Sequence, residues 1–246
     1  MRIGQRGQDL PNSVGDSVLS CLGGINRGNC PLITQPNQNL GNLNEKISEG
    51  RFRDVYRYND LVIKKPKHYK IKTLLSIEVR IPTSLYTLVN YAIRDFNKYE
   101  YKQYESIISK IPSDLHKCFA KVHKPIKYNK TCYSINQLVI DHGGQISKTL
   151  SEYGKVKDEQ FWSLIDELEK RFLENRIWFF SVGPPNICVN RQADGRLVPV
   201  LIDYKRSGMR TFWSQLLLFF PYFSRQKMRR RFQKLRERCK DCKRSV

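Results

Sequence analysis

The feature that most constrains the fold of this chain is a predicted β-hairpin at residues 187–202. Two short apolar runs, residues 187–189 and residues 197–202, are separated by residues 191–196. The connecting segment contains Asp194-Gly195, a dipeptide typical of the tight turns that join antiparallel strands. Because such a turn brings the outer ends of its strands together, the residues just outside the hairpin are expected to be neighbours.

Oxygen-bearing side chains stand at both outer ends of this hairpin. Asn186 precedes the first apolar run, and Asp203 follows the second. An amide oxygen and a carboxylate suit a hard cation such as magnesium. A simpler interpretation also fits, in which the asparagine caps a turn and the aspartate ends a strand. The hairpin alone leaves both interpretations open.

The segment upstream predicts further strands and two helices. Residues 47–58 alternate as one strand that contains Gly50, and after the turn Asn59-Asp60 a second strand ends near Lys64. Apolar spacing predicts helices at residues 97–110 and 161–172. Residues 118–122 and 133–140 are interpreted as two more strands. These elements predict an α+β fold.

Composition limits the class of protein and the compartment. The 246 residues are 40% hydrophobic, which is enough for a core, and a formal charge of +21 predicts attraction to nucleic acid, anionic lipid or phosphorylated ligands. The longest apolar stretch, residues 216–223, is far shorter than the roughly 20 residues that span a bilayer. The seven cysteines form no disulfide framework, and Cys239 and Cys242 have the spacing of half a zinc site only. We expect free thiols in a cytoplasmic protein.

The C-terminal segment, residues 211–246, is strongly basic, with 11 Lys and Arg against two acidic residues and a net charge of +9. Three interpretations stay open. In the first, Met228, Phe232 and Leu235 form one stripe of a helix that packs on the core. In the second, aromatic and basic residues bind an anionic membrane surface at the inner face of the membrane. In the third, which is less favoured because no reading motif accompanies it, the segment contacts nucleic acid.

The order of these features resembles the protein-kinase-like fold, and in particular the YrbL family of PhoP regulatory network proteins. The motifs that carry the resemblance are, in chain order, ISEGRFRDVY, LVIKK, YEYKQYE, DHGG, LENRIWFFSVGPPNICVNR and VLIDY. The resemblance implies a two-lobed fold with a small β-rich N-lobe at residues 45–141 and a mostly helical, reduced C-lobe at residues 142–210. A disordered tail at residues 1–44 and the basic aromatic extension at residues 211–246 would flank the lobes.

The same resemblance implies an ATP site with magnesium. Lys64 would hold the α- and β-phosphates, and Glu100 would pair with that lysine. Gly50 would let the backbone approach the phosphates, because a Cβ there would clash. The resemblance also implies that the adenine would lie against the connector from Gln137 to Asp141. The magnesium ligands would be Asn186 and Asp203.

Two departures from the kinase pattern bear on activity. Ser181 stands where kinases carry the catalytic aspartate, and Gly183 stands where a lysine usually steadies the γ-phosphate. A serine does not accept a proton as a carboxylate does. The resemblance therefore implies a nucleotide-binding regulatory protein with weak or no phosphotransfer activity. The alternative is a non-catalytic interaction protein whose basic tail binds a membrane surface or a polyanionic partner.

Overall fold

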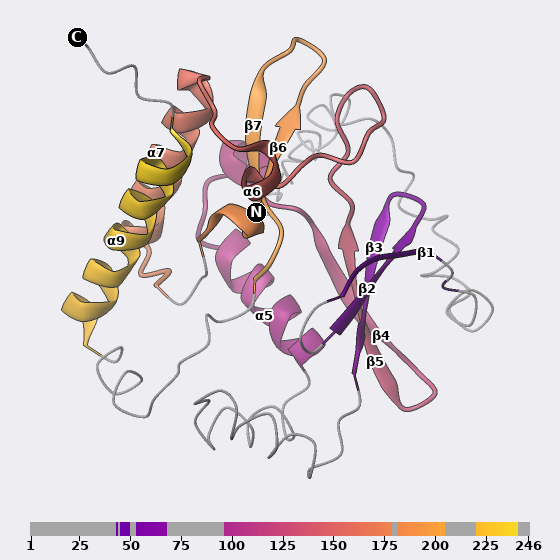
Figure 1. Cartoon of the computed structure of the whole chain (residues 1–246). Coiled ribbons are helices and arrows are strands. Elements are labelled where there is room, and N and C mark those ends of the chain that lie inside the picture. The colour runs from indigo at the N-terminus through magenta and orange to yellow at the C-terminus, as the bar shows by residue number, and fades with distance from the viewer. Residues whose placement is uncertain are drawn as a thin grey trace, which may run out of the picture.

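The computed structural model describes residues 43, 45–49, 53–67, 96–178, 182–204 and 220–240. Within these ranges the chain is α+β, as predicted, with a β-sheet in its N-terminal part and helices in its C-terminal part. Figure 1 shows the five-stranded sheet on one side of the molecule, helices α7 (Glu159–Glu174) and α9 (Pro221–Cys239) on the other, and α5 (Phe96–Ile108) between them. The predicted disordered tail at residues 1–44 lies outside the described residues, apart from residue 43.

The five-stranded sheet is antiparallel throughout and has the order β1-β2-β3-β5-β4. A small apolar cluster on it contains Leu61, Ile63, Tyr133 and Ile135. The bounds of its strands are β1 (Glu45–Glu49), β2 (Arg53–Tyr58), β3 (Leu61–Pro66), β4 (Val122–Tyr128) and β5 (Thr131–Gln137).

Two predictions in this region were wrong. Residues 47–58 are not one strand, because β1 and β2 pair with each other with Glu49 opposite Asp54. Alternation has the same period in two consecutive strands, so the pattern does not reveal where the chain reverses. Residues 118–122 are also not a strand, since the 3₁₀-helix Ser113–Cys118 ends there and β4 begins at Val122. Leu115 and Cys118, the buried residues of that helix, are three apart, which is the 3₁₀ period.

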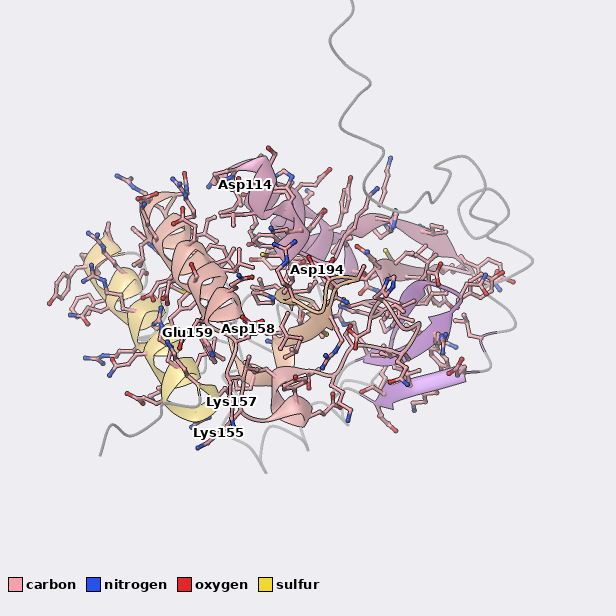
Figure 2. The ribbon with its side chains drawn as sticks, turned by 90° about the horizontal axis from the view of Figure 1, so that it is seen from above. Asp114, Lys155, Lys157, Asp158, Glu159 and Asp194 are labelled. Atoms are coloured by element: carbon pink, nitrogen blue, oxygen red, sulfur yellow. The ribbon has the colours of Figure 1, made fainter. Side chains whose placement is uncertain are left out.

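The predicted hairpin forms as β6 (Ile187–Arg191) and β7 (Leu197–Leu201), which pair antiparallel. Gly195 has a φ of 80°, a conformation that favours glycine. The carboxylate of Asp194, labelled in Figure 2, accepts a hydrogen bond from the backbone nitrogen of Arg196 at 3.0 Å. Asp194-Gly195 therefore marks the turn of the hairpin, as the sequence predicted.

Helix α7 (Glu159–Glu174) extends the predicted helix by two residues at each end. Asp158 caps its start by accepting hydrogen bonds from the backbone nitrogens of Gln160 and Phe161, at 2.8 and 3.2 Å (Figure 2). Its second carboxylate oxygen accepts from the backbone nitrogen of Leu197 at 3.2 Å, which fixes α7 against β7. Within the described residues, the other helices are α5 (Phe96–Ile108), α6 (Leu150–Tyr153), the 3₁₀-helix Pro184–Asn186 and α9 (Pro221–Cys239).

Helix α9 lies along α7 and belongs to the main core (Figure 1). Met228, Phe232 and Leu235 are each at most 1% exposed, which confirms the predicted apolar stripe. The rings of Phe232 and Phe172 meet edge to face with centroids 6.0 Å apart. Cys239 is a buried free thiol, and Cys242 lies outside the described residues. None of the helices in the described ranges is both long and apolar enough to cross a membrane.

Candidate functional site

A buried ion pair joins the sheet to α5. The Lys64 ammonium on β3 donates to Glu100 Oε1 at 2.5 Å, and Glu100 is fully buried while Lys64 is 8% exposed. Asn97, one turn earlier on α5, donates through its amide to the backbone oxygens of Cys132 at 2.6 Å and of Lys64 at 3.3 Å. Asn97 thereby sets the position of α5 on β3 and β5, and this position brings Glu100 to the lysine.

A second cation contacts the same carboxylate. Arg53, at the start of β2, is 5% exposed and donates to Glu100 Oε2. The same guanidinium nitrogen donates to Asn97 Oδ1 at 3.0 Å, and the other terminal nitrogen lies 3.7 Å from Asp203 Oδ1. We call Arg53, Lys64, Glu100 and Asp203 the charged cluster. It joins two strands of the sheet, helix α5 and the end of the β6–β7 hairpin.

Strand β5 supplies polar neighbours for the cluster. The side-chain amide of Asn136 is oriented so that both its oxygen and its nitrogen have hydrogen-bond partners. In this orientation the oxygen of Asn136 accepts from the Lys64 ammonium at 2.9 Å. Its nitrogen then donates to Ser134 Oγ at 2.7 Å and to the backbone oxygen of Ile135 at 3.3 Å. Lys64 is therefore held by a carboxylate and an amide from two different elements.

Burial and neighbouring charge have opposite effects on the pKa of each member of the ion pair. Burial alone would raise the pKa of Glu100, but the charges of Lys64 and Arg53 and their hydrogen bonds outweigh it and lower that pKa to about 2. Burial lowers the pKa of Lys64, and the charge of Glu100 opposes that change. Glu100 is therefore ionised across the neutral range and fixes both cations.

The predicted magnesium ligands lie at the base of the hairpin. Residues 187 and 201 are paired across β6 and β7, and the backbone nitrogen of Ile202 donates to the backbone oxygen of Asn186 at 3.1 Å. Asn186 is half-buried, and the side chain of Asp203 is 24% exposed. The two residues therefore lie at the same end of the β6–β7 hairpin, as the sequence pattern predicted.

Residues 42–240 match the sequence profile of the family described as PhoP regulatory network protein YrbL, a range that covers most of the chain. The chain belongs to the YrbL family. This confirms the resemblance on which the expected roles of Lys64 and Glu100 depend. No curated protein matches the chain.

Two solved structures are similar to this YrbL-family chain at low identity. The apo form of PpkA-294 is 16% identical, with a TM-score of 0.39, and the match covers 66% of this chain and 57% of that one. A crystal structure of a kinase domain is 14% identical, with a TM-score of 0.33 and coverage of 65% and 46%. The chain spans about half the length of these structures.

Four other predicted site residues divide into two groups. Gly50 and Ser181 lie outside the described residues. Gln137 ends β5, and its side-chain oxygen accepts from the backbone nitrogen of Lys121 at 3.1 Å. Asp141 accepts hydrogen bonds from the backbone nitrogen of Arg191 at 3.0 Å and from the Ser147 hydroxyl. Asp141 therefore fixes the loop before α6 against β6, and its contact with a nucleotide stays a prediction.

Arg53 is the member of the charged cluster that sequence reasoning missed. The two-residue turn after β2 sets Tyr58 opposite Leu61, which places Val55 opposite Lys64 and Arg53 opposite Pro66. Residues two apart on a strand share a face, so this register puts Arg53 on the face of Lys64. The register of the hairpin was thus a signal for a second cation beside the lysine.

The residues at the base of the hairpin fit a magnesium ion in their chemistry. Asn186 and Asp203 offer an amide oxygen and a carboxylate, and magnesium usually binds through one or two protein oxygens, waters and substrate phosphates. In the part of the chain that the structure describes, no group of three or more His, Cys, Asp or Glu side chains could hold a metal. A magnesium ion held by these two residues would take its remaining ligands from water or from phosphate oxygens.

Proposed function

We propose that this YrbL-family protein binds ATP, with magnesium as its accompanying ion, at the charged cluster. The observation that carries the proposal is the buried Lys64–Glu100 ion pair at 2.5 Å, which joins strand β3 to helix α5. In protein kinases a lysine on the third strand pairs with a helix glutamate and holds the α- and β-phosphates. A buried ion pair adds little to stability by itself, so a ligand-binding role gives a reason for its presence.

Phosphotransfer by this protein is proposed to be weak or absent, and its role regulatory. Position 181 carries a serine where kinases use an aspartate as the proton acceptor. General-base assistance contributes about 10²- to 10⁴-fold to a rate, whereas positioning and metal charge contribute most of phosphoryl transfer. Loss of the aspartate therefore lowers the expected rate strongly without removing the nucleotide site.

Thermal unfolding with ATP and with adenosine tests the nucleotide site. A ligand that binds only the folded state raises the free energy of unfolding by RT ln(1 + [L]/Kd), about 2.7 kcal/mol at a hundredfold excess over Kd. We expect ATP to raise the melting temperature and adenosine, which lacks the phosphates that Lys64 would hold, to raise it much less. An unchanged melting temperature with millimolar ATP would favour a non-catalytic interaction protein instead.

A second proposed function is attachment to an anionic membrane surface through the start of α9. Phe220, Tyr222 and Phe223 are 54%, 67% and 47% exposed, and the rings of the last two lie 5.6 Å apart. Arginine side chains at positions 225, 229 and 230 follow and are also exposed. Exposed aromatic rings beside basic residues suit the interface between headgroups and acyl chains of anionic lipid.

Co-sedimentation of the full chain with vesicles tests this attachment. We expect the protein to bind vesicles that contain phosphatidylglycerol. The triple substitution Phe220→Ala, Tyr222→Ala, Phe223→Ala should lower the bound fraction of protein by about tenfold or more, because each ring that enters the membrane contributes on the order of 1.5 to 3 kcal/mol. The matched control replaces the exposed Lys234 on the same helix by alanine. Equal binding by the triple variant and the wild type would exclude a contribution of the rings.

A further inference from the structure

Arg53 differs from most arginines because its side chain is buried among charged and polar groups. It is 5% exposed, and its guanidinium contacts three side chains from two other elements: Glu100, Asn97 at 3.0 Å and Asp203 at 3.7 Å. The planar guanidinium with its fork of donors can contact two carboxylates at once, which a lysine ammonium does less well. Arg53 therefore joins the carboxylate of the ion pair to the predicted magnesium ligand.

The formal charges of the four members of the charged cluster cancel one another. Arg53 and Lys64 carry two positive charges, and Glu100 and Asp203 carry two negative charges. A further cation on Asp203 would lie near the guanidinium, and like charges at short range repel, more strongly where water is largely excluded. The Arg53 charge at Asp203 thus lowers the affinity of that carboxylate for a second cation.

The guanidinium is also a group that phosphates bind well. Arginine forms paired, charge-assisted hydrogen bonds with phosphate oxygens, and here it lies beside Lys64, the lysine expected to hold the phosphates. Glu100 and Asn97 hold it in place, so little side-chain freedom remains to be lost when a ligand binds. The fold thus presents two fixed cations at one site.

We propose that Arg53 sets the metal dependence of this site, by competing with magnesium for Asp203 and by supplying positive charge to the phosphates of the nucleotide. This inference rests on the proposed function, because it concerns the same nucleotide. Wild-type protein then binds ATP with an affinity that changes little when magnesium is removed. Protein kinases, which hold magnesium on the corresponding aspartate, provide the contrast.

Calorimetric titration with ATP, in excess magnesium and in excess EDTA, tests this dependence. We expect the two dissociation constants of the wild type to differ by less than about threefold. In Arg53→Lys the shorter side chain keeps a charge beside Glu100 but withdraws the second nitrogen from Asp203, so magnesium should tighten ATP binding about tenfold or more. Arg53→Met, which removes the charge, should show the same magnesium dependence and weaker binding in EDTA.

The matched control is Arg57→Lys, on the same strand, where the partly exposed arginine pairs with the exposed Glu45 at 3.8 Å. It should behave as the wild type. Arg53→Lys keeps the buried charge balance and decides the test even if Arg53→Met does not fold. A wild type that needs magnesium as strongly as Arg53→Lys would overturn this inference and leave the nucleotide site standing. Wild type that binds no ATP in either buffer would overturn both.

Discussion

Replacement of Glu100 by alanine is expected to lower the free energy of unfolding by about 3 to 5 kcal/mol. Glu100 is fully buried and accepts from both Lys64 and Arg53. Without its carboxylate, two cations remain largely buried with one fewer negative charge, and loss of one partner of a buried ion pair is costly for this reason. Urea unfolding followed by circular dichroism measures the change.

Glu105→Ala is the matched control, because Glu105 lies on the same helix and is exposed. Its substitution should change the free energy of unfolding by about 0.5 kcal/mol or less. A similar, small change in both variants would mean that Glu100 does not hold the two cations in solution.

The contribution of Glu100 to the free energy of unfolding depends on pH. Its pKa falls from a usual 4.5 to about 2 in the folded protein. A carboxyl with a lowered pKa in the folded state contributes stability that is fully present above the unfolded pKa and is lost as the pH falls toward the folded pKa. The difference in stability between the wild type and Glu100→Gln should therefore narrow as the pH is lowered from about 4.5 toward 2. A difference that stays constant over this range would contradict the ionised, paired carboxylate.

Replacement of Phe232 by alanine is expected to cost about 3 to 5 kcal/mol, because a large ring in a packed core leaves a cavity. Phe232 on α9 is 1% exposed and packs edge to face on Phe172 of α7. The substitution tests whether the C-terminal helix is part of the folded core. Thermal and urea unfolding measure the loss.

Lys234→Ala serves as the control on α9, since Lys234 is exposed two residues further along the helix. We expect it to change stability by about 0.5 kcal/mol or less. If Phe232→Ala were equally mild, α9 would not contribute its buried stripe to the core in solution, and the basic segment would behave as a separate tail.

The parts of the fold that local chemistry determines could be predicted from the sequence. Asp194-Gly195 marked the β6–β7 turn because glycine readily adopts a positive φ, and the hairpin then placed Asn186 and Asp203 at one end. The stripe of α9 followed from the helical period. The choice of Glu100 came from the family resemblance, since the apolar pattern of α5 does not distinguish it from Glu105.

The parts that depend on distant contacts were not predicted. Arg53 and Glu100 are 47 residues apart, and Arg53 and Asp203 are further apart still, so no local pattern connects them. The turn after β2 sets the register that puts Arg53 on the face of Lys64, but this register does not show which carboxylates reach the arginine. The position of a buried polar residue is determined by the partners that satisfy it, and these partners emerge only from the packed fold.

The central claim, that the charged cluster binds the phosphates of ATP, is tested most directly by calorimetric titration of ATP into wild-type protein, Lys64→Met and Lys65→Met. Lys65 is the next residue of the same strand, but it is exposed. We predict that the wild type and Lys65→Met bind with the same dissociation constant. Lys64→Met should bind about tenfold or more weakly, since a hydrogen bond to a charged group contributes about 1.5 to 3 kcal/mol. Equal affinity in all three proteins, or no binding to the wild type, would contradict the claim.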